Sequence, residues 1–267
     1  MDQREREPLV VTSDELVERL REIAATHPAA LLAFDGDGTL WSGDVGEDVF
    51  HQALKHGLLR DAALPALQRE ANKFGVPSDG NANDVAARLF TAYLEQRYPE
   101  RDVCAMMTWC YAGMRREELI DIARTAFAER HLAERLHEEL AAVFAYARGV
   151  GIRTIVVSAS PQPIVETAAA HWRIEPSDIA ASRAREHDGL ILDELAAPVP
   201  YADGKPIALR ELVPNAELVA AFGDNAFDVE LFQAAHIGVA VRPKPALRRR
   251  FAEVKSLCIL AEPVSAR

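Results

Sequence analysis

The chain has 267 residues, of which 49% are hydrophobic, and a formal net charge of −11. That length is enough for one or two domains with a sizeable core. The acidic charge argues against nucleic acid as the main partner, and no apolar run reaches the roughly 20 residues of a membrane span. The charged N-terminus lacks an apolar signal region, and three cysteines are too few for a disulfide framework. We therefore expect a cytoplasmic globular protein with neither nucleic acid nor a membrane as its partner.

The first predicted elements are a helix and a buried strand. Residues 12–15, Thr-Ser-Asp-Glu, form a capping-box pattern, and apolar residues at helical spacing extend this helix to about Thr26. The apolar run 31–34, Leu-Leu-Ala-Phe, predicts a strand over about 30–35. That strand ends in the segment 35–39, Asp-Gly-Asp-Gly-Thr, where the glycines favour a turn of the backbone.

The next hundred residues show mostly helical periodicity. No strand is evident between about Gly46 and Ala147, and a loop at 75–81 breaks the region. The helices are expected near 46–57, 61–73, 83–97, 102–113, 115–129 and 133–148.

Strands and helices then alternate to the end of the chain. Strands are expected at 152–157, 178–181, 218–222, 236–241 and 256–260, helices from about 161, 206 and 226, and a hairpin at 183–195. This alternation predicts a parallel sheet with helices on both faces. The expected fold is α/β, with a three-layer Rossmann-like core (1–44 and 149–267) and an inserted all-helical cap domain (45–148).

Two carboxylates stand at the end of the first strand. A turn would bring Asp35 and Asp37 near one pocket, and adjacent carboxylates repel each other unless a cation is present. Ligands in such sheets bind at the carboxyl ends of the strands, where Ser158, Lys205 and the pair Asp224/Asp228 also fall. A nucleophile, a proton carrier, groups for phosphate oxygens and acidic metal ligands suit phosphoryl transfer with Mg²⁺.

Four segments match the motifs of a known superfamily in order and spacing. They are 34–40 (Phe-Asp-Gly-Asp-Gly-Thr-Leu), 156–160 (Val-Val-Ser-Ala-Ser), Lys205 and 223–228 (Gly-Asp-Asn-Ala-Phe-Asp). On these residues the chain resembles the haloacid dehalogenase (HAD)-like hydrolase superfamily, in its phosphoserine-phosphatase-like branch with a helical cap. The resemblance covers both flanks of the predicted insert.

The resemblance implies a role for each motif residue. Asp35 attacks the phosphoryl group and forms an aspartyl-phosphate, and Asp37 protonates the leaving group and then activates water. The groups implied for the phosphoryl oxygens are Ser158, Lys205, Gly38 and Thr39. The implied ligands of the Mg²⁺ cofactor are Asp35, the backbone carbonyl of Asp37, Asp224 and Asp228, the last acting through water or by orienting Lys205.

The predicted function is that of a Mg²⁺-dependent phosphatase acting on a small phosphorylated metabolite. A dehalogenase is disfavoured because a halide leaving group needs no proton, whereas Asp37 is present to supply one. Two alternatives stay open: a phosphotransferase or phosphomutase of the same superfamily, and a catalytically idle protein that binds a phospho-ligand.

The cap is expected to choose the leaving group. Asp44 lies close to where phosphoserine phosphatases keep a carboxylate for the substrate amine, so Asp44 and Glu47 are candidates for contact with phosphoserine or another amine-bearing phosphoester. Both residues would equally serve to start a helix. An aromatic wall of Trp41, Trp109 or Tyr111 and a carboxylate site at Arg115 and Arg116 are further options.

The motifs depart from those of phosphoserine phosphatases at Gly38, where Ser or Thr is typical, and at Phe227, where Asn is usual.

Overall fold

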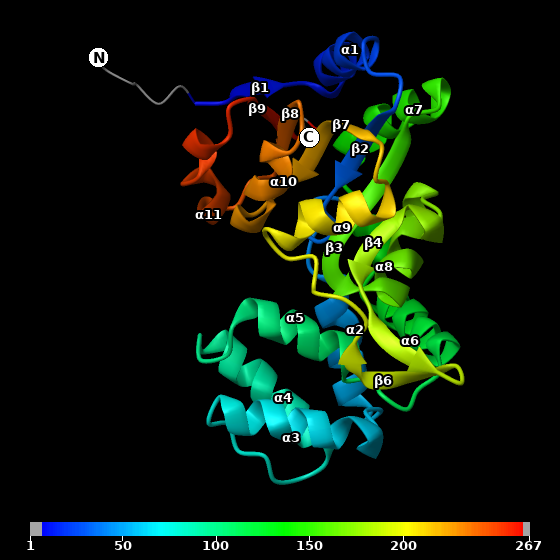
Figure 1. Ribbon diagram of the computed structural model, residues 1–267, viewed down its shortest axis with the longest axis vertical. Helices are drawn as coiled ribbons and strands as arrows, with labels where there is room; N and C mark the ends of the chain where they lie inside the picture. Colours follow the sequence, from blue (N-terminus) through cyan, green and yellow to red (C-terminus); the bar gives the residue numbers. More distant parts are fainter. Residues whose placement is uncertain (1–6, 264–267) are drawn as a thin grey trace.

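The computed structural model describes residues 7–263 and centres on a parallel sheet. The strand order is β1-β9-β8-β7-β2-β3-β4, and every neighbouring pair is parallel, as predicted (Figure 1). The strands are β1 (Leu9–Val11), β2 (Ala30–Phe34), β3 (Arg153–Pro161), β4 (Ile179–Ser182), β7 (Glu217–Gly223), β8 (Ile237–Val241) and β9 (Leu257–Leu260).

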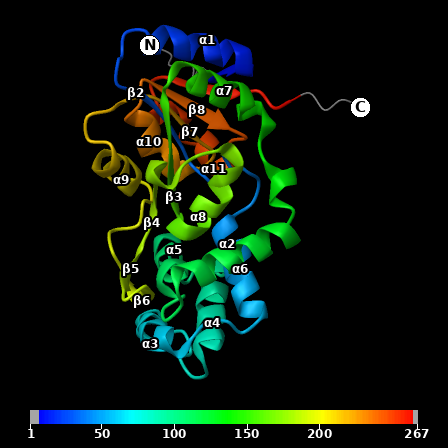
Figure 2. The same ribbon diagram turned by 90° about the vertical axis from the view of Figure 1, so that its right-hand side faces the viewer.

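Helices cover both faces of this sheet. The first face carries α1 (Ser13–Ala24), α7 (Ala141–Val150) and α8 (Gln162–Ala169), and the second carries α9 (Gly204–Leu212), α10 (Val229–Gln233) and α11 (Pro245–Arg248). Figure 2 shows α8 and α9 on opposite sides of β3 and β4. Because both faces are covered, β2 is apolar throughout: Leu32 and Phe34 enter one core cluster and Leu31 and Ala33 the other.

The inserted region forms a separate helical layer, in the lower half of Figure 1. Its helices are α2 (Val45–Lys55), α3 (Leu64–Lys73), α4 (Ala82–Leu94), α5 (Glu100–Trp109) and α6 (Arg116–Glu129). A 3-10 turn at Asp61–Ala63 precedes α3. We refer to residues 45–131 as the cap.

The structure differs from the prediction of one helix over 133–148. Two short 3-10 helices, Leu132–Arg135 and Glu138–Leu140, come first, and only then does α7 begin. Helix α7 packs on α1 and β3, and its Phe144 ring stacks on Phe34 with centroids 4.7 Å apart. Since α7 buries its apolar side against the sheet, we propose that the insert ends before this helix rather than at residue 148.

A hairpin that follows β4 in the chain contacts the cap. Its strands are β5 (Ala184–His187) and β6 (Leu190–Leu195), and the turn residues Asp188 and Gly189 both have positive φ, 51° and 74°. Positive φ at both central positions is typical of tight hairpin turns. The Gly113 amide donates to the Ile191 carbonyl at 2.8 Å, so the hairpin lies against the loop between α5 and α6.

The chain passes from core to cap near residue 42 and returns near residue 135, and hydrogen bonds join these two segments. The Ser42 amide donates to the Arg135 carbonyl at 2.9 Å, and the His137 amide donates to the Leu40 carbonyl at 3.0 Å. The buried His137 ring contacts the Thr39 carbonyl oxygen and Ser42 Oγ, both at 2.8 Å. These contacts connect the first motif directly to the return crossing. Between residues 7 and 263, no helix is both long and apolar enough to cross a bilayer.

Candidate active site

The sequence motifs meet at the carboxyl ends of three adjacent strands. Asp35 follows β2, Asp224 follows β7 and Ser158 lies in β3, and β2 pairs with both of the other strands. Lys205 lies in the first turn of α9, directed at the same point. All four side chains are buried, with Lys205 at 0% exposure.

Lys205 connects two of the predicted carboxylates. Its Nζ donates to Asp35 Oδ1 at 2.6 Å and to Asp228 Oδ1 at 2.5 Å. Burial alone would lower the pKa of Lys205, but the charges of Asp228 and Asp35 more than offset that effect and hold the pKa above its usual value. The two carboxylates therefore favour the charged form of Lys205 beside Asp35.

The surroundings of Asp35 nevertheless disfavour its charged form. Burial, followed by the charges of Asp228 and Asp224, raises the pKa of Asp35 well above its usual value, against the lowering effect of Lys205. A carboxylate nucleophile must be deprotonated. A further cation in the site would favour the charged form.

The acidic residues offer a place for such a cation. Asp35, Asp224 and Asp228 each have an oxygen within 4.8 Å of the others. Asp224 Oδ1 is buried and has no hydrogen-bond partner among the described residues, and burial together with Asp228 raises the pKa of Asp224 to about 6. An all-oxygen donor set with one unpaired buried oxygen fits Mg²⁺.

Asp228 and Lys244 complete this cluster. Asp228 Oδ2 accepts hydrogen bonds from the amides of Asp224 and Asn225 at 3.0 and 2.9 Å, so with Lys205 on Oδ1 both of its oxygens are occupied. Lys244 Nζ lies 2.8 Å from Asp224 Oδ2. The sequence analysis missed Lys244, although it follows β8 at the same edge of the sheet.

The structure explains the glycine in the first motif. Gly38 has φ of +82°, and a Cβ there would lie 2.0 Å from Asp224 Oδ2. A side chain would therefore displace the acidic cluster, whereas the bare backbone lines the cavity described below. Thr39 is fully buried behind this loop, its hydroxyl has no partner among residues 7–263, and it does not line that cavity.

Asp37 is held apart from the acidic cluster. Its Oδ1 accepts hydrogen bonds from Trp41 Nε1 and from the Val45 amide, both at 2.8 Å. Its Oδ2 accepts from Ser160 Oγ at 2.7 Å. Asp35 and Asp37 thus face one cavity in different surroundings, the arrangement expected when two carboxylates have different tasks.

That cavity, which we call the catalytic cavity, has a volume of about 390 Å³ and lies between core and cap. Asp44 and Glu47 line this cavity, and Asp44 also caps α2, because Oδ1 accepts from the Glu47 amide at 2.8 Å. Burial, and next the charge of Asp37, raises the pKa of both residues. Lining residues that the sequence analysis missed are Glu100, Tyr93, Cys104 and Tyr201.

The further options considered for the cap lie outside this cavity. Trp41, Trp109 and Tyr111 are buried and do not line the catalytic cavity. Arg116 pairs with Glu166 and Glu186 on the core side, and neither it nor Arg115 reaches the cavity. The aromatic wall is formed instead by Tyr93, Tyr201 and Phe227.

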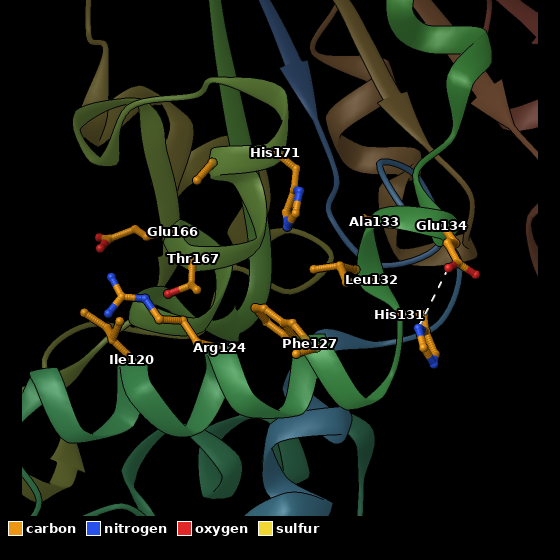
Figure 3. Close-up of a pocket in the computed structure, with 12 residues that line it drawn as sticks. Ile120, Arg124, Phe127, His131, Leu132, Ala133, Glu134, Glu166, Thr167 and His171 are labelled. Carbon is orange, nitrogen blue, oxygen red and sulfur yellow. Dashed lines mark ion pairs between the residues drawn. The ribbon is translucent and has the colours of Figure 1, made fainter.

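A larger cavity of about 610 Å³ lies elsewhere, between α6 and α8 (Figure 3). Phe127 and Leu132 face it, and His131 pairs with Glu134 at its margin with a separation of 3.8 Å. None of the motif residues lines it.

The family model of the haloacid dehalogenase-like hydrolases matches residues 32–233, which include all four motifs and the cap. The chain belongs to this hydrolase family. Its membership confirms the resemblance inferred from the motifs and accounts for the parallel sheet with a helical insert.

Relatives extend the comparison. Phosphoserine phosphatase SerB2 of Mycobacterium tuberculosis is 33% identical over 106 residues, which are 38% of this chain and 25% of that protein. The matched part is thus about a quarter of that curated relative.

Among solved structures, a Bordetella pertussis protein of unknown function has a TM-score of 0.67 at 18% identity, covering 87% of this chain and 98% of its own. A substrate-bound phosphoserine phosphatase complex has a TM-score of 0.53 at 16% identity, covering 85% and 91%. At such identities the two structures support the fold alone.

Proposed function

We propose that the protein is a Mg²⁺-dependent phosphatase that hydrolyses a small phosphomonoester through an aspartyl-phosphate on Asp35. The observation that carries this proposal is that Asp35 contacts Lys205 and lies close to Asp224 and Asp228, while Asp37 is held separately at the same cavity. Membership of the hydrolase family and the likeness to SerB2 support it.

In the first step, an Asp35 oxygen attacks phosphorus and the bond from phosphorus to the leaving oxygen breaks. Lys205 is positioned to neutralise Asp35 and to hold a phosphoryl oxygen, and the Ser158 hydroxyl and Gly38 backbone line the same cavity. Asp37 donates its proton to the departing alkoxide. Charge on the phosphoryl oxygens is therefore met by groups already in place.

In the second step, Asp37 accepts a proton from a water molecule that attacks the phosphorus. The bond from Asp35 to phosphorus breaks, which releases inorganic phosphate and the free carboxylate. Asp35, Asp224 and the backbone carbonyl of Asp37 would hold Mg²⁺, while Asp228 positions Lys205. When bound, Mg²⁺ supplies positive charge to the phosphoryl oxygens and favours the ionised form of Asp35.

The test is hydrolysis of 4-nitrophenyl phosphate with and without Mg²⁺. We expect metal-dependent release of inorganic phosphate, its loss in Asp35→Asn, and retention in Asp121→Asn, a matched change of an exposed cap aspartate. A wild-type protein that turns over no phosphomonoester would overturn the proposal. Transfer of phosphate to a second alcohol instead of water would indicate a phosphotransferase.

We also propose a reducing compartment, the cytoplasm, as its location. Cys104, Cys110 and Cys258 are all free thiols, and Cys110 and Cys258 are buried. Burial raises the pKa of each of these two thiols, which makes them poor nucleophiles.

A further inference from the structure

We propose that the leaving group of the substrate carries a positive charge, such as an amine, and carries no carboxylate. This inference rests on the proposed phosphatase function and concerns the part of the catalytic cavity that faces the cap. It separates the preferred substrate from phosphoserine, which bears both an amine and a carboxylate.

The wall of the catalytic cavity opposite the phosphate-binding groups is acidic. Asp44 and Glu47 reach it from the start of α2, and Glu100 reaches it from the first residue of α5. The Glu47 carboxylate and Asp44 Oδ2 have no hydrogen-bond or ion-pair partner among the described residues. Three carboxylates around one cavity leave a negative region that a cationic group would neutralise.

The pKa shifts of Glu47 and Tyr93 agree with a negative region on the cap side of the cavity. The Coulomb effects of Asp37 and Asp48 add to burial in raising the pKa of Glu47, and the lowering effect of Lys244 does not cancel them. The pKa of the neighbouring Tyr93 is raised by burial and then by Glu100 and Glu47. The cap side of the cavity is thus short of positive charge.

Within residues 7–263, every cation that lines the cavity is already paired with a carboxylate. Among the described residues that line the cavity, the only cationic side chains are Lys205 and Lys244. Lys205 is paired with Asp35 and Asp228, and Lys244 with Asp224. The guanidinium of Arg101, near the cavity, is turned to Asp203 at 2.6 Å and does not line it. A substrate carboxylate would meet carboxylates and no unengaged partner.

Aromatic rings form a further part of the cavity wall. Tyr93 lies on the cap side, whereas Tyr201 and Phe227 lie on the core side with ring centroids 4.9 Å apart. The Tyr201 hydroxyl donates to Glu100 Oε2 at 3.2 Å, which joins the aromatic and acidic walls. Aromatic faces attract ammonium groups, and a volume of about 390 Å³ suits a small molecule.

The experiment compares kcat/KM for four phosphomonoesters of similar size: 2-aminoethyl phosphate, 2-hydroxyethyl phosphate, phosphoglycolate and phosphoserine. We expect 2-aminoethyl phosphate to exceed 2-hydroxyethyl phosphate by about 10-fold to 100-fold, the range of charge-assisted hydrogen bonds. Phosphoserine is expected to fall below 2-aminoethyl phosphate, and phosphoglycolate to be the poorest. Glu47→Gln and Glu100→Gln should each reduce the ratio of aminoethyl to hydroxyethyl turnover.

Glu117→Gln is the matched control, because Glu117 is an exposed cap glutamate that does not line the cavity. It should leave the ratio unchanged. The inference is overturned if kcat/KM for 2-hydroxyethyl phosphate, phosphoglycolate or phosphoserine equals or exceeds that for 2-aminoethyl phosphate, or if the Gln variants lower kcat/KM equally for the aminoethyl and hydroxyethyl esters. Turnover of 4-nitrophenyl phosphate in the same preparation separates these outcomes from failure of the phosphatase function, in which no ester is hydrolysed.

Discussion

Asp37 is oriented by donors from three separate parts of the chain. They are the Trp41 indole, the first amide of α2 at Val45 and the Ser160 hydroxyl at the end of β3. Gly46 permits this arrangement, since a Cβ there would lie 2.9 Å from Ser160 Oγ. With both oxygens engaged, the carboxyl group has little freedom to rotate away from the leaving group.

In the proposed mechanism, this geometry makes Trp41 and Ser160 positioning residues for proton transfer. We expect Trp41→Phe and Ser160→Ala each to lower kcat for an alkyl phosphate about 10-fold or more, because general acid catalysis contributes about 10²-fold to 10⁴-fold. The loss should be smaller for 4-nitrophenyl phosphate, whose leaving group needs no proton. The measurement is the ratio of the two kcat values in each variant.

Trp172→Phe is the control for Trp41→Phe, because it also removes an indole N–H donor but one that is not bound to Asp37. Trp172 Nε1 donates to the Leu40 carbonyl at 3.3 Å and does not contact Asp37. Its kcat ratio should match that of the wild type. Equal losses on alkyl and aryl phosphates in Trp41→Phe would instead indicate general damage to the site.

At the scale of elements, α7 shows where helical periodicity alone is insufficient. The pattern correctly predicts a helix in this region, but it does not say which neighbour the apolar face meets. Phe144 is 1% exposed and stacks on Phe34 and Trp172, each with centroids 4.7 Å apart. The helix therefore contributes to the core although it follows the cap in sequence.

Phe144→Ala should lower the free energy of unfolding by about 3–5 kcal/mol, the usual cost of truncating a buried phenylalanine. Urea denaturation followed by circular dichroism measures this change. Leu94→Ala, at a cap residue with 65% exposure, is the comparison and should change stability by about 0.5 kcal/mol or less. A loss below about 1 kcal/mol for Phe144→Ala would contradict the placement of α7 in the core.

The sequence predicts the positions of those site residues that lie at the carboxyl ends of strands. Asp35, Ser158 and Asp224 follow from the rule that carboxyl ends of parallel strands share an edge, and the same rule applied to β8 would have found Lys244. Glu100 and Tyr201 could not be found this way, because they meet only when α5 docks against the loop before α9. Strand β1 was missed because it has three residues, and two of them, Leu9 and Val10, are more than half exposed.

For the whole molecule, Mg²⁺ should act as a stabilising ligand. At 100 times its dissociation constant a ligand of the folded state adds about 2.7 kcal/mol, so Tm should rise with Mg²⁺ at pH 7.5. The shift should be smaller at pH 5: the pKa of Asp224 is raised to about 6, so this carboxyl is then mostly protonated and the metal must displace the proton.

The matched variants for this measurement are Asp224→Asn and Asp188→Asn. Asp224→Asn should abolish the Mg²⁺-dependent shift, whereas Asp188→Asn, in the exposed hairpin turn, should retain it. An equal shift in both variants would show that the metal binds elsewhere.

The hydrogen bond from the Val45 amide joins the cap to Asp37, the residue that we propose as proton carrier. Any displacement of α2 breaks this bond and leaves Asp37 with two of its three donors. In the proposed mechanism, Asp37 would therefore be fully aligned, as acid or as base, only when α2 is in place. Water reaching Asp35 with α2 displaced would meet an Asp37 that lacks one of its three donors.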